Sequence, residues 1–255
     1  MTSDIPFPAA VALALLAAYA IGSVSFAVII SRLMGLADPR SYGSGNPGAT
    51  NVLRSGNRAA AVLTLAFDAL KGYVPVLLVL IYGPRFGLGE GTAAFAGLAA
   101  FLGHLWPVFF KFQGGKGVAT AAGMLLGLNP WLGAATLLTW VIIAVFFRYS
   151  SLAALVSAVF APFYQALIWG VEPALLAIAI MSLLLVWRHE GNLRKLLAGT
   201  ESRLGQKSAT AAAGPKAGHA GHAHGHGQGE HKHRHPKPHD HKPREHKSHG
   251  HKKGH

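Results

Sequence analysis

The chain has 255 residues, of which 51% are hydrophobic and only 13% are charged. It contains no cysteine, which excludes disulfides, thiol catalysis and cysteine-ligated metals. Its formal net charge of +13 is divided between a hydrophobic part and a basic carboxyl-terminal tail, and no base-reading motif accompanies that charge. We therefore expect a membrane protein with no nucleic-acid partner.

The first hydrophobic segment covers residues 5–30 without a charge. It is too long for the apolar core of a signal peptide, and no positive charge precedes it, so we expect one retained transmembrane helix. Four arginines follow it closely: Arg32, Arg40, Arg54 and Arg58. Because basic loops remain in the cytoplasm, this pattern predicts an amino terminus outside the membrane.

Further hydrophobic segments predict helices over residues 59–82, 92–110, 118–128, 131–147, 152–169 and 173–187. Residues 118–128 are too few to span a core of about 30 Å at about 1.5 Å per residue. This segment must nevertheless cross if the basic residues after the last helix are to share the side of Arg54. The sequence thus predicts an all-α polytopic membrane protein with seven transmembrane helices, the fourth short, and a cytoplasmic carboxyl terminus.

The second hydrophobic segment contains two ionisable residues, Asp68 and Lys71. Their i, i+3 spacing places them on one helix face, and charged groups within a membrane usually face the interior of a bundle. A structural ion pair and direct contact with a substrate are both consistent with this pattern.

The first polar cluster is SYGSGNPGATNVLR at residues 41–54. Glycine allows positive φ and asparagine tolerates the left-handed region, so we expect an irregular loop. Its amides, the hydroxyls of Ser44 and Thr50, and the Arg54 guanidinium can surround an anion. A glycine- and proline-rich turn between two membrane helices would have the same composition.

Two more polar clusters follow, at residues 104–120 and 189–203. In the second cluster a G-G-K-G turn sets amides beside the Lys116 ammonium, which suits a phosphate, although a plain basic loop is the alternative. It is not a Walker A loop, because Gly117 stands where the magnesium-binding hydroxyl belongs. In the third cluster His189 and Asn192 are i, i+3, and His189 suits either a general base or a structural hydrogen-bond donor.

Four stretches together resemble a known family: GSGNPGATNVLR at 43–54, FDALKGYVPV at 67–76, GHLWPVFFKFQGGKGVAT at 103–120 and RHEGNLRKLLAGTESRLG at 188–205. They are similar to the bacterial acylphosphate-dependent glycerol-3-phosphate acyltransferases, the PlsY family. The resemblance implies a multi-pass enzyme of the bacterial inner membrane with its active site facing the cytoplasm. The implied reaction, an early step of phospholipid synthesis, transfers a fatty acyl group from acyl phosphate to the 1-hydroxyl of sn-glycerol 3-phosphate. Lysophosphatidic acid and phosphate are the implied products, with no cofactor and no metal in the site.

The resemblance also implies the site residues. Those implied as catalytic are Ser44, Arg54, Lys116, His189 and Asn192. Those implied to bind substrate or shape its pocket are Gly43, Gly45, Asn46, Thr50, Asn51, Gly114, Gly115, Gly117, His104 and Glu201. The implied mechanism has no covalent enzyme nucleophile, which fits the absence of a serine–histidine–aspartate triad from the motifs.

Residues 206–255 differ in composition from the membrane domain of residues 1–205. They contain 13 of the 15 histidines, interleaved with glycine, lysine and proline. Such a segment cannot build a core, so we expect a disordered cytoplasmic tail. Its imidazoles favour weak binding of divalent metal, and a solvated extension without function is the alternative.

A multi-pass transporter of a phosphorylated solute is the competing interpretation. Ionisable residues within the membrane and a broken helix also occur in ion-coupled carriers. The polar residues of this chain, however, crowd one predicted face, and its two halves do not repeat. The pattern therefore favours the enzyme.

Overall fold

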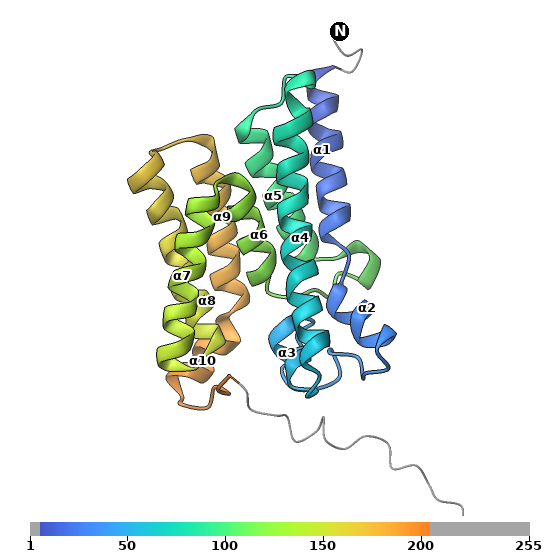
Figure 1. The fold of residues 1–255 in the computed structure, drawn as a ribbon, viewed down its shortest axis with the longest axis vertical. Coiled ribbons are helices and arrows are strands. Elements are labelled where there is room, and N and C mark those ends of the chain that lie inside the picture. The colour runs from blue at the N-terminus through green and yellow to red at the C-terminus, as the bar shows by residue number, and fades with distance from the viewer. Residues whose placement is uncertain (1–5, 205–255) are drawn as a thin grey trace, which may run out of the picture. The chain divides into compact units, whose positions relative to one another are not determined.

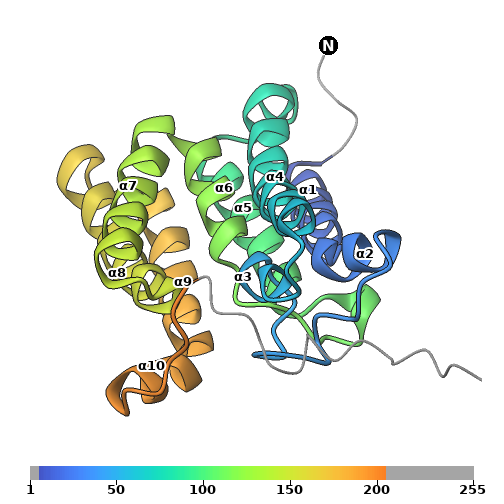
Figure 2. The ribbon, with the colours of Figure 1, turned by 60° about the horizontal axis from the view of Figure 1, so that its bottom comes forward.

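The hydrophobic runs of the chain form a helical bundle (Figures 1 and 2). The computed structural model describes residues 6–204. Its longer helices are α1 (Phe7–Gly22), α4 (Arg58–Tyr82), α5 (Glu90–Leu105), α6 (Val118–Leu128), α7 (Pro130–Phe147), α8 (Ser150–Tyr164) and α9 (Pro173–Arg188). Shorter elements are α2 (Phe26–Leu33), α3 (Ala49–Leu53), α10 (Glu190–Leu197), 3₁₀ turns at Gly83–Phe86 and Val108–Phe110, and a π-helical turn at Gln165–Trp169. No strand occurs in residues 6–204, which confirms the all-α prediction; the predicted tail and its metal binding lie outside this range.

The first hydrophobic segment differs from the single helix predicted for it. It is broken after Gly22, and α2 begins at Phe26. The Val24 carbonyl lies in the break and accepts a hydrogen bond from Lys71 Nζ of α4, over 2.7 Å. A backbone carbonyl left free inside an apolar bundle is costly, so this cation on a neighbouring helix stabilises the break.

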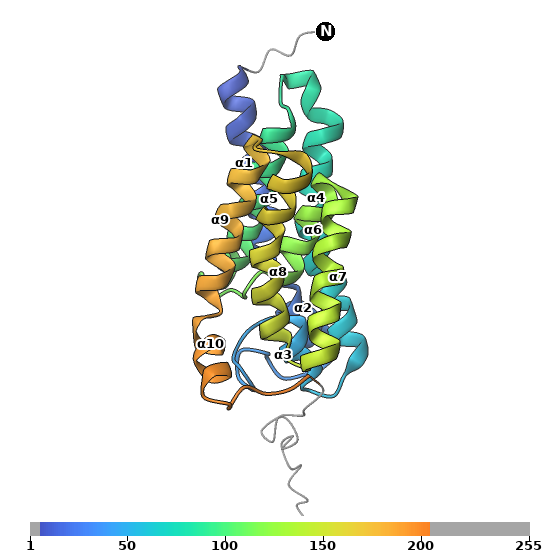
Figure 3. The same cartoon turned by 90° about the vertical axis from the view of Figure 1, so that its left-hand side faces the viewer.

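The first and third polar clusters lie at one end of the bundle. In Figures 1 and 3, α2, α3 and α10 lie at the end opposite the one where α1 begins. The connections from α4 to α5, α6 to α7 and α8 to α9 lie toward the end where α1 begins. The short α6 therefore runs back between the two ends, and it meets α7 before reaching the level at which α4 meets α5.

Several helical segments are long and apolar enough to cross a membrane. Within residues 6–204 there are five: Phe7–Leu33, Arg58–Phe86, Glu90–Phe110, Pro130–Phe147 and Ser150–Trp169. The pair α9 and α10, bent by 55°, makes a sixth if it counts as one span, and α6 is shorter. Large apolar side chains such as Leu16, Phe146 and Leu183 cover the outside of the bundle, as a lipid-facing surface requires. The seven crossings and the outer amino terminus stay predictions.

Glycines bring α6 close to α4. A Cβ added to Gly72 of α4 would overlap the backbone of Thr120, and one added to Gly123 of α6 would overlap the backbone of Ala69. Small residues allow helices to approach at backbone distance inside a membrane bundle. This contact fixes the amino-terminal turn of α6, which directly follows Lys116.

Candidate active site

A buried asparagine holds the first polar loop in its shape. Asn51 is 2% exposed, and its amide donates to the carbonyls of Pro39 and Tyr42 over 2.6 and 3.1 Å. Its Oδ1 accepts the backbone N–H of Ser44 over 3.0 Å. The residues after Gly48 form the short helix α3, where the sequence predicted only an irregular loop. Asn51 therefore fixes the loop, and Ser44 within it, from the inside.

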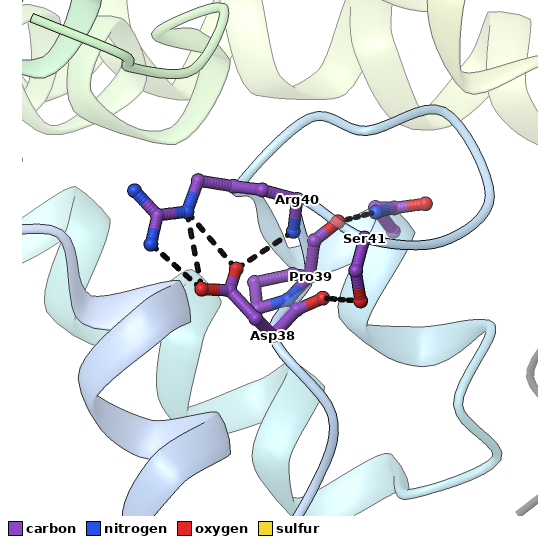
Figure 4. A network of polar contacts seen from close by, with 5 residues as sticks. Asp38, Pro39, Arg40 and Ser41 are labelled. Carbon is purple, nitrogen blue, oxygen red and sulfur yellow. Dashed lines mark hydrogen bonds and ion pairs between the residues drawn. The ribbon is translucent and has the colours of Figure 1, made fainter.

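Arg40, just before this loop, and Arg54, at its end, have different surroundings. Arg40 forms an ion pair with Asp38 at 2.7 Å, and Figure 4 shows its guanidinium beside that carboxylate. Arg54 lines the main cavity, where it donates to Ser202 Oγ over 2.5 Å and to Asn51 Oδ1 over 3.4 Å. Arg54 thus connects the first loop with the third cluster and carries its charge at the cavity wall.

The glycines of the second loop allow it to lie against the end of α5. A Cβ at Gly114 would overlap the carbonyl oxygen of His104, and a Cβ at Gly115 would overlap the His104 imidazole. Arg188 donates to the carbonyls of both glycines over 3.2 and 3.1 Å. Gly117 has a φ of +82°, which turns the chain into α6. The G-G-K-G turn is therefore fixed by its packing, with Lys116 at the cavity.

A chain of hydrogen bonds joins the second loop to the third cluster. Lys116 Nζ donates to Asn192 Oδ1, and Asn192 Nδ2 donates to Glu201 Oε1 over 2.7 Å. Ser151 Oγ of α8 donates to the same carboxylate oxygen over 2.7 Å. Burial lowers the pKa of Lys116 to about 8, and the nearby Glu201 carboxylate acts in the opposite direction. Lys116 is therefore mainly protonated at neutral pH and loses its charge in mildly alkaline solution.

His189 lies at the junction between α9 and α10 and is 3% exposed. Its Nδ1 lies 2.8 Å from the carbonyl oxygen of Leu185, and because a carbonyl only accepts, Nδ1 carries the proton. The neutral imidazole then has an unprotonated Nε2. His189 also lines the cavity, so its ring is held in place by one nitrogen and has the other for a ligand.

These groups surround one end of a cavity of about 730 Å³. Most of the remaining wall is apolar and comes from α4, α6, α7, α8 and α9, including Leu65, Leu125, Leu137, Trp140, Ala158 and Met181, although Asp68, Thr136 and Ser157 also line it. Cations and hydroxyls at one end bind an anion, and the apolar wall removes hydrocarbon from water. The cavity thus fits a molecule with an anionic head and an apolar chain.

The structure brings most of the predicted site residues into this cavity. Its wall includes Ser44, Asn46, Thr50, Asn51, Arg54, His104, Lys116, Gly117, His189, Asn192 and Glu201. Gly43, Gly45, Gly114 and Gly115 are not in the wall; they shape the loops that carry it. The sequence analysis did not select several other lining residues, namely Arg58, Ser150, Ser151, Ser202 and Arg203. Ser202 and Arg203 directly follow Glu201 in the third motif, which is the signal that would have identified them.

The fold and the cavity define an integral membrane protein with a site for a phosphorylated, lipid-like molecule. The sequence profile described as glycerol-3-phosphate acyltransferase matches residues 12–199. The chain belongs to the glycerol-3-phosphate acyltransferase family. It is an acyltransferase and not a transporter, which confirms the resemblance drawn from its motifs.

Relatives and solved structures agree with this assignment. A glycerol-3-phosphate acyltransferase of Paraburkholderia phytofirmans is 65% identical over 202 residues, which cover 79% of this chain and 94% of the relative. One of Ralstonia nicotianae is 67% identical over 191 residues, which cover 75% and 92%. The crystal structure of PlsY (YgiH), an integral membrane glycerol 3-phosphate acyltransferase, in its glycerol 3-phosphate form has a TM-score of 0.71 and 37% identity, over 76% of this chain and 96% of that one. Its lysophosphatidic acid form has a TM-score of 0.69 and 36% identity, over 76% and 94%.

Proposed function

We propose that this acyltransferase moves a fatty acyl group from an acyl phosphate to the 1-hydroxyl of sn-glycerol 3-phosphate. The observation that carries the proposal is that Arg54 and Lys116 line the polar end of the same cavity whose other walls are mainly apolar. Such a cavity accommodates two phosphate groups and one acyl chain. The names of the two similar PlsY structures, in glycerol 3-phosphate and lysophosphatidic acid forms, support the same acceptor and product.

The reaction needs no nucleophile from the enzyme. The 1-hydroxyl oxygen attacks the acyl carbonyl carbon, the bond from that carbon to the phosphate oxygen breaks, and a phosphate oxygen takes the hydroxyl proton. An acyl phosphate is a mixed anhydride and already activated, so positioning and charge neutralisation supply most of the rate. We assign the phosphate of glycerol 3-phosphate to Ser44 and Arg54, and the charge on the departing phosphate to Lys116. Glu201 positions Asn192, which in turn positions Lys116.

The choice of acyl donor tests the proposal. Purified full-length enzyme is incubated with glycerol 3-phosphate and either palmitoyl phosphate or palmitoyl-CoA. We expect lysophosphatidic acid, with an equal amount of inorganic phosphate, from palmitoyl phosphate alone. Product from palmitoyl-CoA at a comparable rate, or from neither donor, would contradict the proposed donor.

His189→Gln tests whether the substrate phosphate accepts the proton. Glutamine keeps a hydrogen-bonding side chain but cannot serve as a base near neutral pH. We expect folded His189→Gln enzyme to keep kcat within about tenfold of the wild type. Loss of a general base would instead lower the rate by about 10²–10⁴-fold. A larger fall in kcat with unchanged substrate binding would make His189 the general base and exclude the substrate-assisted step.

We also propose seven crossings of the bacterial inner membrane, with the polar end in the cytoplasm. The alternation of helices in Figure 3 and the basic residues at the polar end, Arg58, Arg148 and Lys195 among them, support this orientation. The chain has no cysteine, so any labelling by a thiol reagent comes from the single cysteine that is introduced. Cysteine at the exposed positions Gln113 and Gly191 is expected to react with impermeant reagent only from the cytoplasm, and cysteine at Gly89 only from outside. The opposite labelling at Gly191 would mean that α6 does not cross.

A further inference from the structure

An ion pair that has no part in the phosphate contacts assigned above lies inside the bundle. Lys71 Nζ is 2.8 Å from Asp68 Oδ1, and the two side chains are 2% and 3% exposed. Lys71 also lies over the ring of Phe26, at 5.8 Å from its centroid. Two charges in an apolar interior are costly to bury, and their mutual attraction often does no more than offset that cost. A stability role alone is therefore a weak explanation for this pair.

Lys71 reaches the break that separates α1 from α2. Its Nζ donates to the Val24 carbonyl over 2.7 Å, and at the start of α2 the ring of Phe26 stacks on Phe67 of α4 at 5.0 Å. Residues of α2 pack with Val52 of α3 in one buried cluster. Lys71 therefore fixes the direction in which the chain leaves the break toward the first phosphate-binding loop.

Asp68 reaches the second loop through His104. Asp68 Oδ1 lies 3.7 Å from His104 Nδ1, and His104 is 7% exposed. The opposite edge of the imidazole, at Nε2, packs where a Cβ of Gly115 would be. Gly115 directly precedes Lys116 in the chain. A shift of the His104 ring would therefore move the backbone at Gly115 and with it the Lys116 side chain.

We propose that Asp68 and Lys71 are positioning residues that set the spacing between the two phosphate-binding loops. Lys71 acts on the first loop through the helix break, and Asp68 acts on the second loop through His104. Lys71 also neutralises Asp68, which lies in the cavity wall and would otherwise repel anionic substrates. This inference rests on the proposed function, because its effect is read as the enzyme's capture of glycerol 3-phosphate.

The test separates positioning from stability with one single and one double variant. Lys71→Met leaves a carboxylate unpaired, and Asp68→Asn/Lys71→Met removes both charges at similar side-chain volume. We expect the KM for glycerol 3-phosphate to rise by about tenfold or more in both variants, since small displacements of a positioned group have effects of this size. The KM for palmitoyl phosphate should change by less than about threefold, because the apolar wall holds the acyl chain. Thermal stability should fall in the single variant and recover in the double variant, which has no unpaired buried charge.

Val76→Ala is the matched control, since Val76 is fully buried on the same helix and contacts α5 and α6 instead of the loops. It should lower thermal stability and leave both KM values unchanged, because partial unfolding reduces the amount of active enzyme and not its affinity. Wild-type KM values in the double variant would overturn the inference and leave only a structural ion pair. So would a fall in kcat without a change in KM.

Binding of glycerol 3-phosphate by calorimetry, without an acyl donor, keeps the two proposals distinguishable. Wild-type enzyme that binds glycerol 3-phosphate but uses neither acyl donor contradicts the proposed donor alone. In that case a raised dissociation constant for glycerol 3-phosphate in the double variant still supports the positioning role. An unchanged dissociation constant contradicts that role alone.

Discussion

Lys116→Ala is expected to lower kcat by about 10²–10³-fold, the usual cost of removing one donor that stabilises charge in a transition state. The ammonium is partly buried at the cavity, where Asn192 accepts its hydrogen bond and Glu201 accepts one from Asn192. A fixed cation in such surroundings acts on the departing phosphate without reorganising water. The KM values should change less than kcat, since Arg54 and the apolar wall remain. The measurement is steady-state kinetics with palmitoyl phosphate and glycerol 3-phosphate.

The pH dependence of activity and one further variant, Lys116→Arg, test the charge of Lys116 itself. Wild-type activity should fall as pH rises through about 8, because the Lys116 pKa is lowered to about 8 and the deprotonated amine has no charge. Lys116→Arg keeps its charge at that pH, so its lower activity should not show this fall. As a control, Lys111→Ala removes an exposed lysine outside the cavity wall and should leave kcat unchanged. A wild-type kcat in the Lys116→Ala enzyme would contradict a role for Lys116 in the mechanism.

Arg54→Lys is expected to raise the KM for glycerol 3-phosphate by about 10–100-fold, with a smaller change in kcat. A hydrogen bond to a charged group is worth about 1.5–3 kcal/mol, and about 1.4 kcal/mol is a tenfold change in affinity. Lysine keeps the charge but not the planar fork, which here donates to both Ser202 and Asn51. The substitution therefore weakens the grip on a phosphate and loosens the first loop from the third cluster.

Arg40→Lys is the matched control for Arg54→Lys. Arg40 directly precedes the first polar cluster, but its guanidinium is paired with Asp38 and is not in the cavity wall. The same chemical change at Arg40 should leave the KM for glycerol 3-phosphate within about threefold, as a partly exposed ion pair contributes little. Equal effects of the two substitutions would mean that the loop responds as a whole and that Arg54 has no special contact with the acceptor phosphate.

The sequence by itself determined the positions of most helices. Residues 118–128 were predicted as a short helix and form α6 with those bounds, because apolar residues fill the segment and Asn129-Pro130 ends it. The family was also readable, since three polar clusters and the segment at 67–76 have a specific order and spacing. Both are local properties, set by residues close together in the chain.

The tertiary structure decided how these parts act on one another. The first segment is apolar throughout and predicts one helix, but it is broken near Val24, whose carbonyl accepts a hydrogen bond from Lys71, 47 residues away. The contact of Arg54 with Ser202 spans 148 residues, and that of Lys116 with Asn192 spans 76. The G-G-K-G motif suggested that the amides of Gly114 and Gly115 bind phosphate. In the structure these two glycines instead pack against the end of α5. Contacts between distant helices depend on the packing of the whole bundle, and no local pattern in the chain encodes them.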